Sequence, residues 1–166
     1  VTARSSDAPT SFALHASASR ADLIASVKAF AAAAESLSPV PDVSDAFVPF
    51  GEFAVVRSIV RARAFHPIFI TGDSGNGKTF QVEQACALEG REYLRVNITE
   101  ETDEDDLIGG FRLKNGETVF ELGPVPVAML RGAVLLLDEV DLAGPKVMCL
   151  QPVLEGRALK IGRAHV

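Results

Sequence analysis

Hydrophobic residues recur at helical spacing in several parts of the chain. A capping-box sequence at residues 19–22 precedes the first set, which predicts a helix that runs to residue 35 or 36. The second set follows an entry loop at residues 47–50 and predicts an amphipathic helix that ends near Ala64. Residues 80–89, which follow a glycine-rich stretch, are also expected to be helical.

Short apolar runs at residues 67–71 and 93–98 predict β-strands between these helices. Residues 134–137 are continuously apolar, which is typical of a buried central strand in a parallel sheet. The order of strands and helices therefore favours an α/β fold with a parallel central sheet.

Residues 111–122 predict a β-hairpin, because apolar positions flank Asn115 and Gly116, the strongest short-range hairpin signal. The hairpin is either a β-ribbon decoration or a moving finger that reaches a substrate, and both interpretations stay open. Helices follow at residues 125–131 and 144–155, and Pro152 is expected to kink or split the second one. The apolar residues expected in the core there are Met148, Leu150, Val153 and Leu154.

Composition narrows the class of protein. The formal net charge of the 166 residues is −6, so the surface as a whole is not expected to attract nucleic acid. Arg57, Arg61 and Arg63 are candidates for a local basic patch. The longest purely apolar run, residues 29–34, is too short to cross a membrane.

The chain is expected to contain one domain and an appendage. Residues 1–45 read as a polar tail, a helix and a proline-containing linker at 38–44, and residues 46–166 as the functional domain. Cys86 and Cys149, each in a predicted helix, indicate two reduced thiols and a cytoplasmic setting.

Residues 72–79, GDSGNGKT, match the phosphate-binding loop pattern G-x-x-x-x-G-K-[ST] at every fixed position, between a predicted strand and a predicted helix. Glycines let successive N–H groups turn toward phosphate oxygens, and the following helix directs its positive end at the same anion. Lys78 would reach the β- and γ-phosphates, and the Thr79 hydroxyl would hold Mg²⁺. The candidate ATP-binding residues are Gly72, Asp73, Ser74, Gly75, Asn76, Gly77, Lys78, Thr79 and Phe80.

Two adjacent carboxylates, Asp138 and Glu139, end the apolar strand at residues 134–137. Ligands of open α/β sheets bind at the carboxyl ends of the strands. Asp138 is therefore the second candidate Mg²⁺ ligand beside Thr79. Glu139 is a candidate general base for the water that attacks the γ-phosphate, and together with Lys78 it completes the candidate catalytic residues.

Six of the seven residues at 100–106 are acidic. They lack the ligand order and the glycine of a calcium loop, so a solvated helix start is favoured over a metal site.

Four segments occur in an order that resembles AAA+ ATPases: GDSGNGKT, DLIGG at residues 106–110, the hairpin that ends in Gly123-Pro124, and LLLDEVDLA at residues 135–143. The match is closest to the dynein-related/MoxR-type branch, and within it to cobaltochelatase small-subunit-like ATPases of bacteria and tailed phages. LQPVLEG at residues 150–156 is also similar to that group.

The resemblance implies a P-loop three-layer sandwich with an inserted hairpin, and a ring, commonly hexameric, that couples ATP hydrolysis to remodelling or metal insertion by an unidentified partner. By the same resemblance Lys78 and Thr79 bind the phosphates and Mg²⁺, Asp138 serves the metal and Glu139 activates water. The family continues with a fourth strand, a sensor residue, an arginine finger and a lid. Their absence predicts a C-terminally truncated fragment that is inactive alone, and residues 161–166 match a reading frame of a common sequencing adapter.

Two functions from different classes remain. The first is an ATPase motor in which Glu139 is catalytic, and the second is a nucleotide-responsive scaffold that binds ATP without turnover. The intact Lys78, Thr79, Asp138 and Glu139 favour the motor. A P-loop GTPase or kinase is disfavoured, since adjacent Asp and Glu suit a hydrolase and the chain has no guanine-reading NKxD motif.

Overall fold

The computed structural model describes residues 40–114, 116–161 and 164–165. The helix predicted after residues 19–22 lies outside this range. In chain order the elements are α2 (Phe53–Ala62), α3 (Lys78–Leu88), β1 (Tyr93–Asn97), α4 (Glu104–Leu107), β2 (Gly109–Lys114), β3 (Glu117–Leu122), α5 (Pro124–Arg131), β4 (Val134–Asp138), η2 (Val140–Leu142), η3 (Pro145–Leu150), α6 (Gln151–Leu154), β5 (Lys160–Ile161) and β6 (Ala164–His165).

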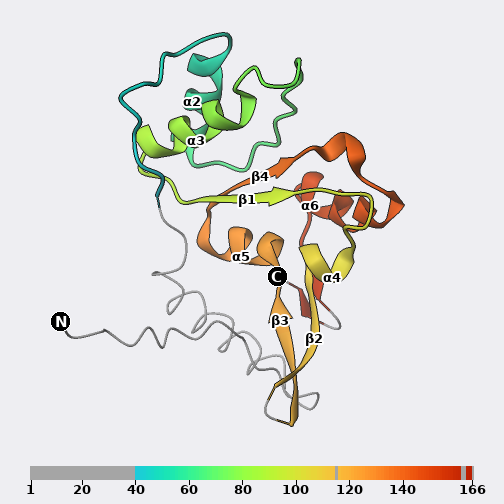
Figure 1. Ribbon diagram of the computed structural model, residues 1–166. Helices are drawn as coiled ribbons and strands as arrows, with labels where there is room; N and C mark the ends of the chain where they lie inside the picture. The colour runs from blue at the N-terminus through green and yellow to red at the C-terminus, as the bar shows by residue number, and fades with distance from the viewer. Residues whose placement is uncertain (1–39, 115, 162–163, 166) are drawn as a thin grey trace, which may run out of the picture.

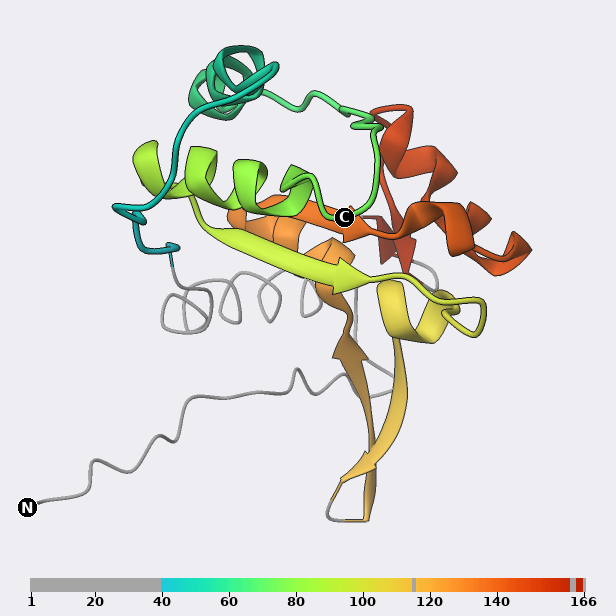
Figure 2. The same cartoon turned by 45° about the horizontal axis from the view of Figure 1, so that its top comes forward.

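Strands β1 and β4 form a parallel sheet between two layers of helices (Figures 1 and 2). Their register pairs Tyr93 with Val134 and Asn97 with Asp138, so both strands end at the same edge. Helices α2 and α3 cover one face around a core that includes Val56, Ala85 and Cys86. The core on the other face is built from the residues Ile98, Leu107, Ile108, Val125, Leu150 and Leu159.

The strand predicted over residues 134–137 is confirmed as β4, but its five residues are half-buried rather than buried. Within the described residues β4 pairs only with β1, so one of its edges has no ladder partner there. A strand reaches full burial only when both neighbours and both faces are covered.

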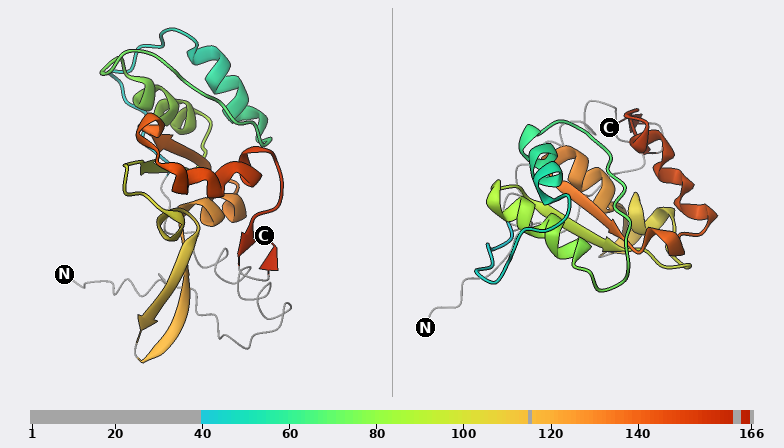
Figure 3. Two further views of the ribbon diagram at one scale, coloured as in Figure 1. Left: turned by 90° about the vertical axis from the view of Figure 1, so that its right-hand side faces the viewer. Right: turned by 90° about the horizontal axis from the view of Figure 1, so that it is seen from above.

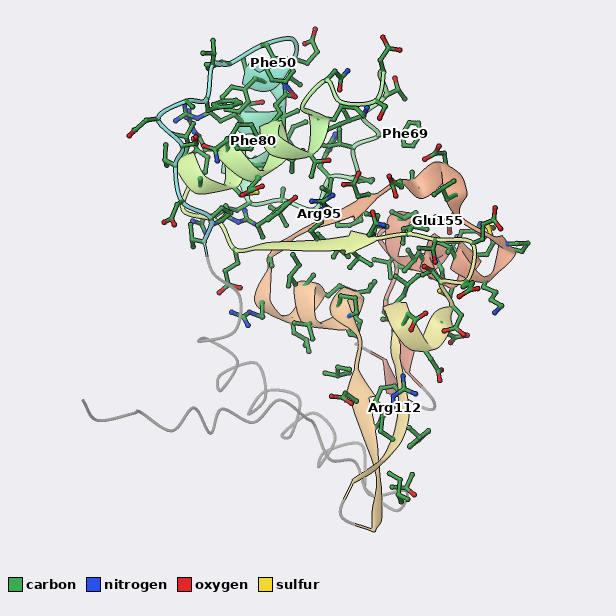
Figure 4. The ribbon with its side chains drawn as sticks, in the orientation of Figure 1. Phe50, Phe69, Phe80, Arg95, Arg112 and Glu155 are labelled. Atoms are coloured by element: carbon green, nitrogen blue, oxygen red, sulfur yellow. The ribbon has the colours of Figure 1, made fainter. Side chains whose placement is uncertain are left out.

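The prediction of a strand at residues 67–71 is wrong, because these residues have no regular secondary structure. A strand requires a hydrogen-bonded neighbour, and no described strand pairs with this segment. Ile68 and Phe69 are consequently exposed, with Phe69 76% exposed (Figure 4), whereas Ile70 packs against the α2–α3 core.

The helix predicted over residues 144–155 is split, as Pro152 suggested. The 3₁₀ helix η3 is followed by α6, with Pro152 in the first turn of α6 and Gly156 beyond its end. Leu150 lies in the core, whereas Met148 and Leu154 are exposed, so the core prediction is wrong for these two residues. A 3₁₀ helix has three residues per turn, so apolar residues at α-helical spacing do not all lie on one of its faces. The single apolar stripe predicted for residues 144–155 therefore does not form.

The predicted hairpin is confirmed as the antiparallel pair β2–β3, which extends away from the sheet (Figure 3).

The acidic run at residues 100–106 is confirmed as a helix start. Asp103 caps α4 by accepting from the Asp106 backbone N–H, and the Asp106 side chain accepts from the Asp103 N–H. Such a reciprocal capping box satisfies two N–H groups that the helix leaves unpaired.

Buried glutamines of α3 hold the segment that enters the domain. Gln84 accepts from the Ser44 N–H at 2.8 Å and donates to the Asp42 carbonyl oxygen at 3.1 Å. Gln81 donates to the Phe50 carbonyl oxygen at 2.8 Å. The end of the predicted linker is thus fixed to the helix that follows the glycine-rich loop.

No helix in the described part of the chain is long and apolar enough to span a membrane.

Candidate functional site

The glycine-rich loop, residues 72–77, takes backbone angles that suit only glycine at two critical points. Gly72 has φ +150°, and a Cβ there would lie 2.7 Å from Asn76 Nδ2. Gly77 has φ +80°, and a Cβ there would lie 3.1 Å from Phe50 Cζ. The loop therefore closes tightly on itself and against the entry segment, as close backbone approach to an anion requires.

Helix α3 begins at Lys78, two residues earlier than predicted, so Lys78 and Thr79 occupy its first turn. The Lys78 ammonium folds back over the loop. Its Nζ donates to the carbonyl oxygens of Gly72 and Asp73, both at 2.7 Å, and lies 3.4 Å from Asn76 Oδ1. A positive charge and the N-terminal end of an 11-residue helix therefore act on the same loop.

Asp138 is brought to the start of α3 by the sheet. The Thr79 Oγ1 hydroxyl donates to Asp138 Oδ2 at 3.0 Å, and Arg95 Nη2 lies 2.7 Å from the same oxygen. Side chains alternate along a strand, so Asp138 at the end of β4 shares the α3 face with Val134 and Leu136. The structure thus joins the loop residue and the strand-end carboxylate that the sequence predicted to work together.

Glu139 leaves the strand in a conformation that is uncommon for a residue with a side chain. Its φ is +56° and its ψ is +37°, in the left-handed helical region, and it is exposed. Its backbone N–H donates to Asp138 Oδ1 at 3.1 Å. Non-glycine residues in this region carry a conformational cost and are found at functional sites more often than elsewhere. The turn places Glu139 immediately beside the carboxylate that contacts Thr79.

Residues 67–165, more than half of the chain, match the family described as AAA domain (dynein-related subfamily). The chain belongs to this family. The resemblance to dynein-related and MoxR-type AAA+ ATPases is confirmed, and with it the P-loop α/β fold class.

Among curated proteins, the AAA domain is similar to Protein NorQ of Paracoccus denitrificans, with 34% identity over 114 residues, or 68% of this chain and 42% of NorQ. It is 33% identical to Midasin of Dictyostelium discoideum over 84 residues, or 50% of this chain and 1% of that protein. With Midasin of Giardia intestinalis it shares 36% identity over 106 residues, or 59% of this chain and 2% of that protein. The chain therefore spans less than half the length of each of these relatives.

The residues of this AAA domain fit Mg²⁺ at one position. Mg²⁺ prefers hard oxygen ligands and is usually held by one or two protein groups together with phosphate oxygens and water. Thr79 Oγ1 and Asp138 Oδ2 meet at 3.0 Å and supply such oxygens. Across the part of the chain that the structure describes, no group of three or more His, Cys, Asp or Glu side chains is placed to hold a metal alone. A metal here would therefore depend on a bound phosphate chain.

Residue-by-residue reasoning missed two features of the AAA domain. Arg95 reaches Asp138 because β1 and β4 are parallel and in register, which a single sequence does not reveal. The second feature is a group of phenylalanines beside the loop. Phe47 packs against Phe53 at 4.8 Å and Phe80 at 5.5 Å between ring centroids, and Phe50 contacts the Gly77 position. The clustering of Phe47, Phe50 and Phe53 in the sequence was a usable signal for it.

The candidate basic patch is largely neutralised. Arg57 and Arg61, two of its three residues, both form ion pairs with the Glu89 carboxylate.

Cys86 and Cys149 are free thiols, as expected. Burial raises the pKa of Cys86 to about 12 and also raises the pKa of Cys149, so neither is a reactive thiolate at neutral pH.

Proposed function

We propose that this protein binds ATP and hydrolyses it with Mg²⁺ in an AAA+ ring that drives remodelling or metal insertion by a partner protein. In this proposal the loop residues 72–77 cradle the phosphates and Lys78 contacts the β- and γ-phosphates. Thr79 and Asp138 hold Mg²⁺, and Phe80 borders the bound nucleotide. Bound Mg²⁺ would neutralise charge that develops on the phosphate oxygens.

The contact between Thr79 and Asp138 is the observation that carries the proposal. It joins the first turn of the helix after the loop to the end of β4 at 3.0 Å. Lys78, the neighbour of Thr79, lies over the same loop, so positive charge and hard oxygen ligands converge on one place. That combination suits a nucleoside triphosphate with a divalent metal better than it suits a phosphate-free ligand.

Glu139 is proposed as the general base. Its exposed carboxylate follows Asp138 directly, and its left-handed backbone conformation directs it out of the strand. A base in this position would orient the attacking water and accept its proton, while Lys78 stabilises negative charge that develops on the γ-phosphate.

The β2–β3 hairpin is proposed as the element that contacts the partner. Phe111 and Leu113 on β2 are 62% and 77% exposed and lie two residues apart on one strand, so they offer adjacent apolar side chains to a partner. We further propose that the functional domain begins near residue 46. In this proposal the ring is a hexamer, and the protein acts in the cytoplasm. A role with cobalt rests on the motif resemblance alone.

A two-part experiment tests this function. Binding of a fluorescent ATP analogue to this chain should weaken about tenfold or more in Lys78→Ala, because charge-assisted hydrogen bonds to phosphate are lost. Lys146→Ala, which removes an exposed lysine of η3, is the matched control and should bind normally.

Turnover is tested by phosphate release from a full-length relative that carries the same motifs. The substitution equivalent to Glu139→Gln should retain ATP binding and lose roughly 10²- to 10⁴-fold in rate, the usual contribution of a general base. Equal rates for the two proteins would reject the catalytic role and favour the scaffold that binds ATP without hydrolysing it.

A further inference from the structure

One carboxylate oxygen in the candidate site has two partners. Asp138 Oδ2 accepts from Thr79 Oγ1 at 3.0 Å and lies 2.7 Å from Arg95 Nη2. The Asp138 side chain is mostly buried, whereas that of Arg95 is 53% exposed. A solvent-exposed cation is therefore bound to the oxygen that the proposed function assigns to Mg²⁺.

The sheet explains why Arg95 reaches this position. In the parallel register Arg95 lies opposite Leu136, and Asn97 lies opposite Asp138. Arg95 and Asn97 are two residues apart on β1, so their side chains leave the same face of the sheet. That face is the one covered by α3, since Tyr93, Val134 and Leu136 all pack against the α2–α3 core. A long side chain at position 95 can therefore extend along the sheet to the carboxylate at the end of β4.

We propose that Arg95 is an internal counter-cation that competes with Mg²⁺ for Asp138, so that the metal is accepted only together with a nucleotide. This inference rests on the proposed function, because it requires Thr79 and Asp138 to be metal ligands. Arg95 is a positioning residue in this scheme: it acts on the carboxylate and not on the reacting atoms.

Electrostatics sets the direction of the effect. A divalent ion that approaches Asp138 meets the positive charge of Arg95 beside the same oxygen and must displace it or bind next to it. Metal binding without nucleotide is thereby weakened. A phosphate chain changes the balance, since its oxygens add ligands for the metal and offer the guanidinium a new anionic partner. Metal and nucleotide would then each raise the affinity of the other, by reciprocal coupling.

The alternative is that Arg95 only joins β1 to β4 as a surface ion pair. Such pairs contribute little to stability and would leave metal affinity unchanged. The two explanations therefore differ in metal binding rather than in folding.

Mn²⁺ titration followed by electron paramagnetic resonance separates them, using the 166-residue chain without nucleotide. Arg95→Met should bind Mn²⁺ about tenfold to thirtyfold more tightly than the parent protein, the effect expected when a unit charge about 4–6 Å from a divalent ion is removed in a water-like dielectric. Arg95→Lys should stay close to the parent protein. The matched control is Arg112→Met, which removes a half-exposed arginine on the hairpin that pairs with Asp105 at 3.8 Å, and it should change nothing (Figure 4).

A second set of titrations, with an ATP analogue that is not hydrolysed, measures the coupling. The nucleotide should tighten Mn²⁺ binding less in Arg95→Met than in the parent protein. Unchanged Mn²⁺ affinity of Arg95→Met without nucleotide, or an equal gain in Arg112→Met, would overturn the inference. The variant Asp138→Asn distinguishes failure of this inference from failure of the proposed function. If Asp138→Asn binds Mn²⁺ and nucleotide as the parent protein does, Asp138 is not a metal ligand and the proposed function itself is wrong.

Discussion

The Thr79 hydroxyl donates a 3.0 Å hydrogen bond to Asp138, a residue 59 positions further along the chain. This bond links the first turn of α3, directly after the glycine-rich loop, to the end of β4, so the two candidate metal ligands already lie side by side. Preorganised ligands bind a metal with less reordering of side chains, and each immobilised side chain would otherwise reduce affinity.

Thr79→Val should therefore weaken ATP binding selectively when Mg²⁺ is present. Valine keeps the shape of threonine and removes only the hydroxyl. A net loss of about 1 kcal/mol, typical of one hydrogen bond, corresponds to roughly fivefold in affinity. Titrations of a fluorescent ATP analogue with Mg²⁺ and with a chelator give the comparison. Thr118→Val, an exposed threonine on β3, is the control, and equal losses in both buffers would contradict the prediction.

Glu89 at the end of α3 predicts how stability depends on pH. Hydrogen bonds from Arg61 and Arg57 lower the pKa of Glu89 from its ordinary value of 4.5 to about 2, with Arg57 Nε at 2.6 Å and Arg61 Nη2 at 2.9 Å. The unfolded chain thus takes up this proton at a higher pH than the folded chain. The ion pairs contribute fully to stability above about pH 4.5, and their contribution is lost as the pH falls toward 2.

Thermal unfolding of Glu89→Gln checks this. The variant should melt at a lower temperature than the parent at pH 7, and the difference should shrink steadily between pH 4.5 and pH 2. Glu155→Gln is the matched control, since Glu155 pairs with the exposed Arg157 at 3.3 Å and should contribute little (Figure 4). A melting difference for Glu89→Gln that stays constant across this range would show that the charge of Glu89 is not what stabilises the α2–α3 contact.

Local signals in the sequence were sufficient for much of the fold. The amphipathic stripe of α2, the hairpin signal and Pro152 each act through neighbouring residues, and the helix, the paired strands β2 and β3 and the split of the last helix were confirmed. The acidic helix start was also predictable, because a capping box spans only four residues. The loop and the strand-end carboxylates were found from the same kind of short pattern.

The errors concern features that depend on distant partners. Ile68 and Phe69 have the composition of a strand, but strand formation requires a neighbour that no stretch of five residues specifies. Met148 was expected in the core, whereas a 3₁₀ helix turns its side chain outward. Arg95 was overlooked because its contact with Asp138 depends on the register of β1 against β4.

The two cysteines should differ in reactivity toward a thiol reagent. Cys86 is completely buried beneath α2, and burial raises its pKa to about 12, whereas Cys149 in η3 is only partly buried. Thiolate formation and access both limit the reaction, so Cys149 should be modified first. Cys86 should react only when the protein unfolds. Colour development with a disulfide reagent at pH 8, before and after addition of denaturant, measures the two thiols, and Cys149→Ser should lack the reaction of the native protein. Two thiols of equal rate in the native protein would contradict the buried position of Cys86.

Gly109 lies at the base of the β2–β3 hairpin. Its substitution should show how rigidly the hairpin is attached to the rest of the domain. Gly109 has φ +109°, and a Cβ there would lie against the Glu121 carbonyl oxygen and 2.7 Å from Gly123 N. Gly132 also has a positive φ, +66°, but no atom would lie within 4 Å of its Cβ. Gly132→Ala therefore measures backbone strain alone, at about 1–2 kcal/mol. Gly109→Ala adds a backbone clash and should lose more than about 3 kcal/mol in denaturant unfolding. Similar losses in the two variants would mean that β2 and β3 can separate at their base, and that the hairpin moves freely relative to the sheet.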